Sequence, residues 1–386
     1  MSAPVVNAVL WVSHPDMMLQ RVGGMSVIER QLFTAARAGI ERLWVAAQQP
    51  DAQTLARLRK PEGLVIHWIA KDGEAPSDCK PPYVGLSGDH FIRPDSLRHI
   101  VEAAYAAHTA FQDAQGAAVV QALPFRWERS VAFEKQALPE GAAIRLSEPL
   151  AEGPALGWLL STGPKSQDGF MARHFDRHLS LALSRSLLDT FMTPNMMTVI
   201  SCLLGLAGSA LFLRPDLHLA GAGLVWLHSV LDGCDGELAR IKFQESPLGA
   251  AIDFWGDNLV HLSLFGCLAY GFYRADNSVI PLALGLAAAL GTLGSALLVY
   301  LGKQQRRANP LATPVSGAPL GTALSRLENL LAQRDFIYLL LLLAYLGRTY
   351  EFLWAGAVGA LLFFVMTVYL GRVNREQASS QPHYPG

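Results

Sequence analysis

The chain has 386 residues, which is long enough for two domains. Hydrophobic residues make up 51% of it and charged residues only 16%, a balance that is low in charge for a soluble protein and ordinary for one with a membrane part. A net charge of −1 without a basic block gives no support to a nucleic-acid partner, and four scattered cysteines without a C-x-x-C pair argue against a zinc site or a disulfide framework.

The first 160 residues have the pattern of a soluble α/β domain. Apolar runs such as VVNAVLWV, RLWVAA and GLVIHWIA alternate with helical patterns such as SVIERQLFTAARAG. This alternation predicts a largely parallel sheet covered by helices.

A juxtamembrane segment, residues 161–193, follows this domain. Arg173, Arg177 and Arg185 are interspersed there with phenylalanines and leucines. The pattern predicts an amphipathic helix that lies along a membrane surface and contacts membrane lipids.

Long apolar segments dominate residues 194–375, and we expect a polytopic α-helical bundle there. Six transmembrane helices are predicted near residues 195–213, 217–235, 250–272, 278–301, 335–348 and 352–371. Most approach the roughly 20 residues that a helix needs to cross the hydrocarbon core, and the fifth is short. Residues 376–386 are expected to form a flexible tail.

Basic residues near the ends of these segments predict the orientation. Those on one side are Arg240, Lys242, Lys303, Arg306, Arg307, Arg372 and Arg375, together with the arginines before the first segment. By the positive-inside rule this side is cytosolic, so both termini and the soluble domain are expected in the cytosol, with the bundle in the cytoplasmic membrane.

Four aspartates interrupt the apolar sequence. Asp232 and Asp235 share one helical face with Gly236, Ala239 and Arg240, because these positions follow i, i+3, i+4, i+7 and i+8. On the next helix, the positions i, i+4 and i+8 are occupied by Gly249, Asp253 and Asp257. A short connection makes the two helices antiparallel neighbours, so their acidic faces are expected to meet at the cytosolic end.

Four neighbouring carboxylates in apolar surroundings require compensation. One Asp at the centre of a membrane helix costs roughly 2.5–3.5 kcal/mol, and clustered acids also repel each other. The ligands are all hard oxygens, which favours Mg²⁺, Mn²⁺ or Ca²⁺ over zinc, and two divalent cations would balance four charges. Two-metal sites typically stabilise phosphoryl or phosphodiester chemistry.

The aspartate pattern resembles a known family. D-G-C-D-G-E-L-A-R, eight residues, and then G-A-A-I-D-F-W-G-D match the signature D-x-x-D-G-x-x-A-R-x8-G-x3-D-x3-D of the CDP-alcohol phosphotransferases, also called class I CDP-alcohol phosphatidyltransferases. The resemblance covers about residues 164–375, including the six-span layout.

The resemblance implies a role for each matched residue. Asp232, Asp235 and Asp253 would bind two Mg²⁺ or Mn²⁺ ions, and Asp257 would be the base that takes the proton of the acceptor hydroxyl while also touching a metal. The resemblance also implies a pocket for the cytidine diphosphate, lined by Gly236, Ala239, Arg240 and Gly249. Family members are commonly homodimers, and a homodimer is expected here too.

Other candidates come from outside this motif. Asn195 lies in T-P-N-M-M-T, similar to a P-N-x-x-T element that faces the nucleotide in the family, although a plain helix start with Pro near its first position explains it too. Arg173 and Arg177 resemble the juxtamembrane segment of members that make inositol phosphodiesters and are candidates for gripping an acceptor phosphate, with lipid headgroups as the other explanation. Arg334 is a candidate at the border of the acceptor pocket.

His228 and His261 each lie one turn from an aspartate, on the same helical face. We expect hydrogen-bonded structural histidines there rather than metal ligands.

The soluble domain resembles sugar-type nucleotidyltransferases, as in bifunctional inositol-phosphate cytidylyltransferase and di-inositol-phosphate-phosphate synthases. R-V-G-G-M-S-V-I-E-R and L-S-G-D-H-F carry this resemblance, which implies a metal at Asp89. The glycine-rich triphosphate loop expected after the first strand is replaced by S-H-P-D-M-M-L-Q. We therefore expect a degenerate domain with a regulatory, binding or assembly role.

Together these features predict a membrane enzyme that transfers a substituted phosphate from a CDP-alcohol to an acceptor alcohol and releases CMP. The donor stays open between CDP-diacylglycerol and a soluble CDP-polyol. A divalent-cation or proton-coupled transporter is the alternative, because intramembrane acids also mark ion paths.

Overall fold

The computed structural model describes residues 7–12, 14–70, 83–102, 109–113, 116–122, 134–162, 171–308 and 336–379. These residues divide into two compact units. The first comprises those within 1–163 together with 188–190 and 241–243, and the second those within 164–187, 191–240 and 244–386.

A seven-stranded sheet forms the centre of the first unit, with the strand order β10-β8-β9-β6-β1-β4-β5. Its strands are β1 (Asn7–Trp11), β4 (Arg42–Ala46), β5 (Val65–Ile69), β6 (Tyr83–Ser87), β8 (Thr109–Asp113), β9 (Gly116–Ala122) and β10 (Glu134–Ala137). Strand β1 is parallel to β4 and β6, β5 to β4, and β10 to β8, whereas β9 is antiparallel to both of its neighbours. The predicted α/β fold with a largely parallel sheet is confirmed.

Among the described residues, two small antiparallel ladders and five helices complete this unit. The ladders pair β2 (Arg21–Val22) with β3 (Met25–Ser26) and β7 (His90–Ile92) with β11 (Ala143–Arg145). The helices are α1 (Pro15–Met18), α2 (Val27–Arg37), α3 (Ala52–Arg57), α4 (Pro94–Glu102) and α5 (Glu152–Ser161).

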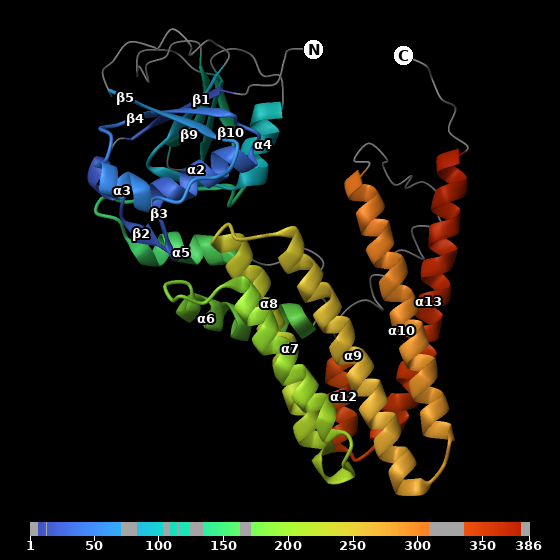
Figure 1. Cartoon of the computed structure of the whole chain (residues 1–386). Coiled ribbons are helices and arrows are strands. Elements are labelled where there is room, and N and C mark those ends of the chain that lie inside the picture. The colour runs from blue at the N-terminus through green and yellow to red at the C-terminus, as the bar shows by residue number, and fades with distance from the viewer. Residues whose placement is uncertain are drawn as a thin grey trace. The chain divides into compact units, whose positions relative to one another are not determined.

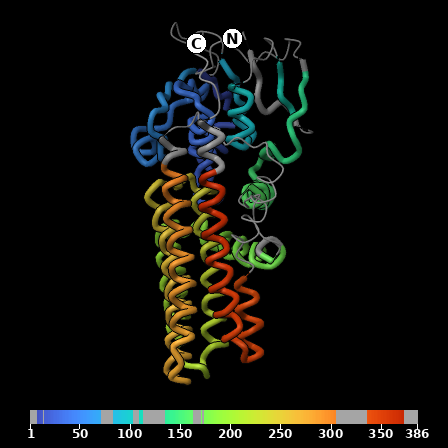
Figure 2. Tube along the Cα trace, turned by 90° about the vertical axis from the view of Figure 1, so that its right-hand side faces the viewer, coloured from blue at the N-terminus to red at the C-terminus, as the bar shows by residue number. Residues whose placement is uncertain are grey.

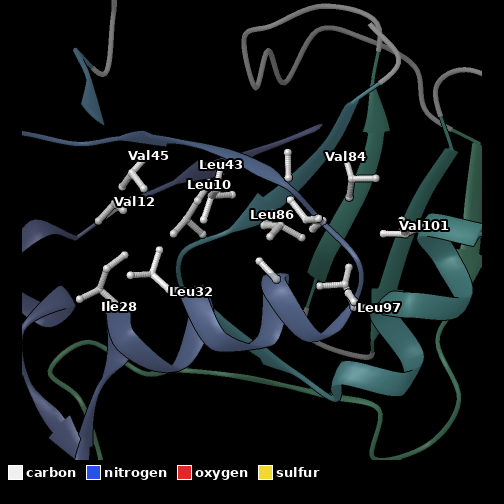
Figure 3. Packing of buried hydrophobic residues seen from close by; sticks show 14 of the residues in the cluster. Leu10, Val12, Ile28, Leu32, Leu43, Val45, Val84, Leu86, Leu97 and Val101 are labelled. Atoms are coloured by element: carbon white, nitrogen blue, oxygen red, sulfur yellow. The ribbon is translucent and has the colours of Figure 1, made fainter. Parts of the chain in front are cut away.

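The core of the first unit lies between the sheet and helices α2 and α4. Ile28 and Leu32 of α2 and Leu97 of α4 are buried against Leu10 and Leu86 of the strands, as Figure 3 shows. Helix α2 begins at a capping box, in which the Ser26 side chain accepts a hydrogen bond from the Glu29 backbone and the Glu29 carboxylate accepts one from the Ser26 backbone.

The second unit is helical. It contains a π-helix η1 (Ala172–Asp176), α6 (Arg177–Leu187), α7 (Pro194–Leu211), the 3₁₀ turn η2 (Pro215–Leu217), α8 (His218–Ile241), α9 (Pro247–Asp276), α10 (Ile280–Ala308), α12 (Phe336–Tyr345) and α13 (Thr349–Ser379). Helix α9 packs against α7 and α10, and α10 packs against α13. Figure 1 and Figure 2 show these long helices running side by side.

Three of the described helices are long and apolar enough to cross a membrane: Pro194–Leu211, Ile280–Gln304 and Thr349–Arg372. A fourth, Phe336–Tyr345, is apolar but shorter. Helices α8 and α9 lie on the second and third predicted spans and carry the acidic residues of the motif. The membrane-type helical region is therefore confirmed, and six spans stay a prediction.

Apolar side chains face both inward and outward in this unit. Phe212, Leu264, Leu340 and Phe352 belong to its buried core, where α7, α9, α12 and α13 meet. Many leucines on the outer faces stay exposed, among them Leu203, Leu286, Leu297 and Leu362. Apolar outer faces are what a lipid-embedded bundle requires, since lipid rather than water surrounds it.

Candidate functional site

The C-terminal half of α8 carries the first two acids of the motif. Asp232 and Asp235 are one helical turn apart, and each is only 5% exposed. Helix α8 continues six residues beyond Asp235, so the whole D-x-x-D-G-x-x-A-R stretch lies on one helix. The chain then turns at Phe243, whose φ is 52°, and enters α9.

The first turns of α9 carry the remaining residues of the motif. Ser246 caps this helix by accepting a hydrogen bond from the Gly249 backbone, and Pro247 occupies its first turn. This start fixes Gly249, Asp253 and Asp257 at successive turns of α9, as their spacing predicted.

Three carboxylates gather between the two helices. Asp232, Asp235 and Asp253 each offer an oxygen, and these oxygens lie within 4.8 Å of one another. Carboxylates this close repel each other when they are ionised, and a divalent cation between them removes the repulsion. The all-oxygen donor set suits Mg²⁺ or Mn²⁺.

Asp257 lies one turn further along α9. Its Oδ1 atom is 3.6 Å from Nε2 of His228, and its side chain is 23% exposed. Nδ1 of the same histidine is 3.0 Å from the carbonyl oxygen of Ser201, which fixes the ring. His228 is thus a buried, hydrogen-bonded residue beside the predicted base, whereas His261 packs edge-on against Phe336.

The residues predicted for the nucleotide line one cavity of about 420 Å³. Asn195 of α7, Gly236, Ala239 and Arg240 of α8, and Gly249 of α9 all face it. Asp235 and Asp253 line the same cavity. Its volume is within the range of small-molecule sites.

Two glycines of the motif make room for polar neighbours in this cavity. A Cβ atom on Gly236 would lie 3.1 Å from a guanidinium nitrogen of Arg240. A Cβ atom on Gly249 would lie 2.8 Å from Oδ1 of Asn195, too close for an undisturbed side chain. The glycines therefore set where the Arg240 and Asn195 side chains can lie.

Sequence reasoning missed Thr198, which is buried near the start of α7. Its hydroxyl is within hydrogen-bonding distance of Oδ2 of Asp235 and of the Pro194 carbonyl oxygen. The hydroxyl hydrogen-bonds the carboxylate and so orients it toward the other acids. The sequence feature that could have identified Thr198 is the P-N-x-x-T element, in which the threonine follows the proline by one helical turn.

Of the three arginines predicted to bind the acceptor phosphate, the structure describes the side chain of Arg177. The Arg177 guanidinium makes an ion pair with Glu237, with Nη1 2.6 Å from Oε1. Arg173 belongs to η1, but its side chain lies outside the described residues, as does the whole of Arg334.

Asp89, in the first unit, lies just beyond the carboxyl end of β6. Its Oδ1 atom contacts the Ser87 hydroxyl and Nδ1 of His90, and its Oδ2 accepts a hydrogen bond from Nε of Arg145 at 3.1 Å. Burial alone would raise the pKa of this carboxyl, but the hydrogen bonds from His90 and Ser87 and the nearby charges hold the pKa well below its usual value. Asp89 also borders a cavity of about 630 Å³ with His14, Arg145 and Glu148.

The family comparison agrees with the helical site. The family model described as CDP-alcohol phosphatidyltransferase matches residues 191–366. This range contains the motif, the cavity and all four aspartates. The resemblance inferred from the motif is thereby confirmed for this part of the chain.

Curated relatives match a limited stretch. A bifunctional IPC transferase and DIPP synthase of Thermococcus kodakarensis is 42% identical over 126 residues, 33% of this chain and 28% of that protein. The corresponding protein of Rubrobacter xylanophilus is 38% identical over 121 residues, 30% of this chain and 26% of that protein. The chain thus aligns with about a quarter of the length of these two relatives.

A solved structure covers more of the chain at lower similarity. The crystal structure of Mycobacterium tuberculosis phosphatidylinositol phosphate synthase with CDP-DAG bound is 19% identical, covers 53% of this chain and 96% of that protein, and gives a TM-score of 0.33. A score of this size does not establish a shared fold.

Proposed function

We propose that the second unit is a membrane enzyme that transfers a substituted phosphate from a CDP-alcohol to the hydroxyl of a second alcohol and releases CMP. One observation carries this proposal: all five residues expected to contact the nucleotide line a single cavity, together with two of the three clustered carboxylates. The family match over residues 191–366 supports it.

The residues present fit a divalent-metal site. Asp232, Asp235 and Asp253 would hold Mg²⁺ or Mn²⁺ through their gathered oxygens, with two ions as the proposed stoichiometry. When bound, such ions neutralise the diphosphate and stabilise the charge that develops on the leaving phosphate. Thr198 keeps the Asp235 carboxylate turned toward this site.

The cavity would hold the nucleotide end of the donor. Arg240 is the cation placed to bind the diphosphate, in the space that Gly236 leaves open. Asn195 lines the same cavity beside Gly249, where its amide can hydrogen-bond the cytidine. Positioning of this kind accounts for much of the rate enhancement in phosphoryl transfer.

Asp257 is the proposed general base. The acceptor oxygen attacks the β-phosphorus, the bond between that phosphorus and the CMP oxygen breaks, and the acceptor proton passes to the Asp257 carboxylate. Its partial exposure leaves it accessible to an acceptor, and Nε2 of His228 lies 3.6 Å from one of its oxygens. A general base positioned in this way typically contributes about 10²–10⁴-fold to the rate.

Substrate identity follows by analogy with the relatives. The two named bifunctional proteins are IPC transferases and DIPP synthases, which favours an inositol-containing donor or acceptor here. CDP-diacylglycerol and CDP-inositol are the two candidate donors, and Arg173 and Arg334 stay candidates for the acceptor phosphate. A homodimer with six spans, and with both termini and the α/β unit in the cytosol, completes the proposal.

For the α/β unit we favour a binding, regulatory or assembly role over cytidylyltransferase activity. Asp89 is engaged by Arg145, His90 and Ser87, so its carboxylate has less capacity left for a metal. Incubation of the full-length chain with CTP, Mg²⁺ and inositol or sugar phosphates should release no pyrophosphate. Pyrophosphate release that the substitution Asp89→Asn abolishes would contradict this role.

Product analysis tests the proposed reaction. Purified protein in detergent or liposomes is supplied with Mg²⁺, with CDP-diacylglycerol or CDP-inositol, and with inositol phosphate or other acceptor alcohols. Mass spectrometry should detect CMP and one phosphodiester product. Cation or proton flux into proteoliposomes without CMP formation would instead favour a transporter.

A further inference from the structure

Helix α6 buries two serines, whereas its other polar residues His178, Arg185 and Ser186 are exposed. Ser180 and Ser184 are buried, and so is Asp176 at the end of η1, at the spacing i, i+4 and i+8 of one helical face. Phe175 and Leu179, in contrast, are 55% and 47% exposed. A polar face can be buried only against polar partners, because unpaired polar groups are costly away from water.

The partner of this face is Glu237 of α8, which is fully buried. Its Oε1 atom is 2.6 Å from Nη1 of Arg177 and accepts a hydrogen bond of 2.7 Å from the Ser180 hydroxyl, and its Oε2 accepts one of 2.7 Å from the Ser184 hydroxyl. One cation and two hydroxyl donors thus satisfy the carboxylate. Removing a single partner from such a buried pair is typically costly, because the remaining charge stays buried without compensation.

Helix α6 lies directly against α8 at this point. A Cβ atom on Gly233 would be 3.3 Å from Cβ of Ser180, and Sγ of Cys234 lies 3.4 Å from the Ser180 carbonyl oxygen. Gly233, Cys234 and Glu237 follow i, i+1 and i+4, so they form one face of α8. Asp235 is two residues from Glu237, about 200° around the helix, and therefore lies on the other side.

A second contact holds the same segment at its start. Oδ1 of Asp176 accepts hydrogen bonds from the Tyr338 hydroxyl of α12 and from Nε1 of Trp226 of α8, the latter at 3.3 Å. The segment from η1 to α6 is therefore fixed to α8 at two places, at Trp226 and at Glu237.

We propose that Glu237 is a positioning residue for the reaction. Through Arg177, Ser180 and Ser184 it locks α6 to the back of α8, and this sets the rotation of α8 that turns Asp232 and Asp235 toward the other acids. Glu237 occupies a variable position of the family signature, and Arg177, expected to grip an acceptor phosphate, serves here as its partner. The effect on turnover rests on the proposed function, whereas the lock itself does not.

The reactivity of a native thiol measures directly how firmly α6 is held against α8, a contact called the lock below. Cys234 is fully buried beneath α6. In full-length protein with Cys79, Cys202 and Cys267 replaced by serine, it should react slowly with a maleimide. Glu237→Gln should accelerate this reaction by about tenfold or more, because a one-sided change to a buried pair favours local opening. Glu351→Gln is the matched control: it changes an exposed pair with Arg348 and should leave the labelling rate unaltered.

A double variant distinguishes a positioning role of Glu237 from a general packing defect. Arg177→Gln combined with Glu237→Gln removes both charges, so no uncompensated charge stays buried. The double variant should label more slowly than Glu237→Gln. It should also recover part of the turnover and of the apparent Mg²⁺ affinity that the single variant loses. A general packing defect would make the double variant worse than either single variant.

The outcomes are distinguishable from those of the proposed function. Labelling of Glu237→Gln at the wild-type rate would overturn the lock, whatever the activity. Faster labelling with wild-type turnover and Mg²⁺ dependence would overturn the positioning role. Absence of CMP release from the wild-type protein would instead contradict the proposed function. If Glu237→Gln does not fold, Ser180→Ala combined with Ser184→Ala keeps the ion pair and must still accelerate labelling.

Discussion

The hydroxyl of Thr198 hydrogen-bonds the carboxylate of Asp235 and so joins the start of α7 to the acidic face of α8. Because Thr198 is buried and also lies 3.1 Å from the Pro194 carbonyl oxygen, it has little freedom to turn away. The start of α7 therefore takes part in orienting a carboxylate of the proposed metal site.

Substitution of Thr198 should weaken metal binding. Thr198→Val keeps the shape and removes the hydrogen bond, so the Mg²⁺ concentration for half-maximal CMP release should rise about 10–100-fold, the usual cost of losing a partner behind a metal ligand. Thr198→Ser keeps the hydroxyl and is the control. An unchanged Mg²⁺ requirement in Thr198→Val would remove this role.

Gly249→Ala should impair nucleotide binding. The new Cβ atom would lie 2.8 Å from Oδ1 of Asn195 and would push that side chain from the cavity wall. We expect a raised KM for the CDP-alcohol with a smaller change in kcat. Gly266→Ala is the matched control on the same helix, because no atom lies within 4 Å of its added Cβ. Equal KM values for the two variants would contradict the cavity assignment.

Substitution of the proposed base and of a proposed metal ligand should have different effects. Asp257→Asn should still bind the CDP-alcohol, but its turnover should fall by about 10²–10⁴-fold, because the proton acceptor is lost while the three clustered carboxylates are kept. Asp232→Asn should lower turnover and metal affinity together. Donor binding is measured by titration calorimetry and turnover by CMP release. Near-normal turnover in Asp257→Asn would refute the base assignment.

The lowered pKa of Asp89 should make the stability of the α/β unit depend on pH in acid. Its folded-state pKa is lowered, so it stabilises the fold fully above the unfolded pKa of about 3.9, and the contribution is lost as pH falls from there through the lower folded pKa. Asp89→Asn removes this contribution. The difference in thermal stability from wild type should therefore be constant near neutral pH and shrink below about pH 4. A difference that does not change down to pH 2 would contradict the lowered pKa.

Local periodicity was enough to predict much of the site. The acids and small residues of the motif lie on two consecutive helices, so helical spacing alone placed Asp232 with Asp235, and Gly249 with Asp253. The short connection then brought the two faces together. The alternating pattern of the first 160 residues predicted the α/β unit for the same reason.

Contacts between distant segments were not predictable in this way. Thr198 is 37 residues from Asp235, and Ser180 is 57 residues from Glu237. The amphipathic pattern of α6 shows two faces but not which one is buried. That depends on a buried acid in another helix, and the motif alone gave Glu237 no role. The number of membrane spans is also hard to establish from apolar character, because the acids on α8 and α9 lower the hydropathy by which spans are recognised.

Metal-dependent CMP release tests the central claim most directly. Purified full-length protein, with CDP-diacylglycerol or CDP-inositol and an inositol phosphate acceptor, should release CMP in the presence of Mg²⁺ or Mn²⁺. The release should stop on addition of EDTA and be largely lost in Asp232→Asn and Asp257→Asn. No CMP from any donor, or CMP release that neither EDTA nor these substitutions diminish, would contradict the account.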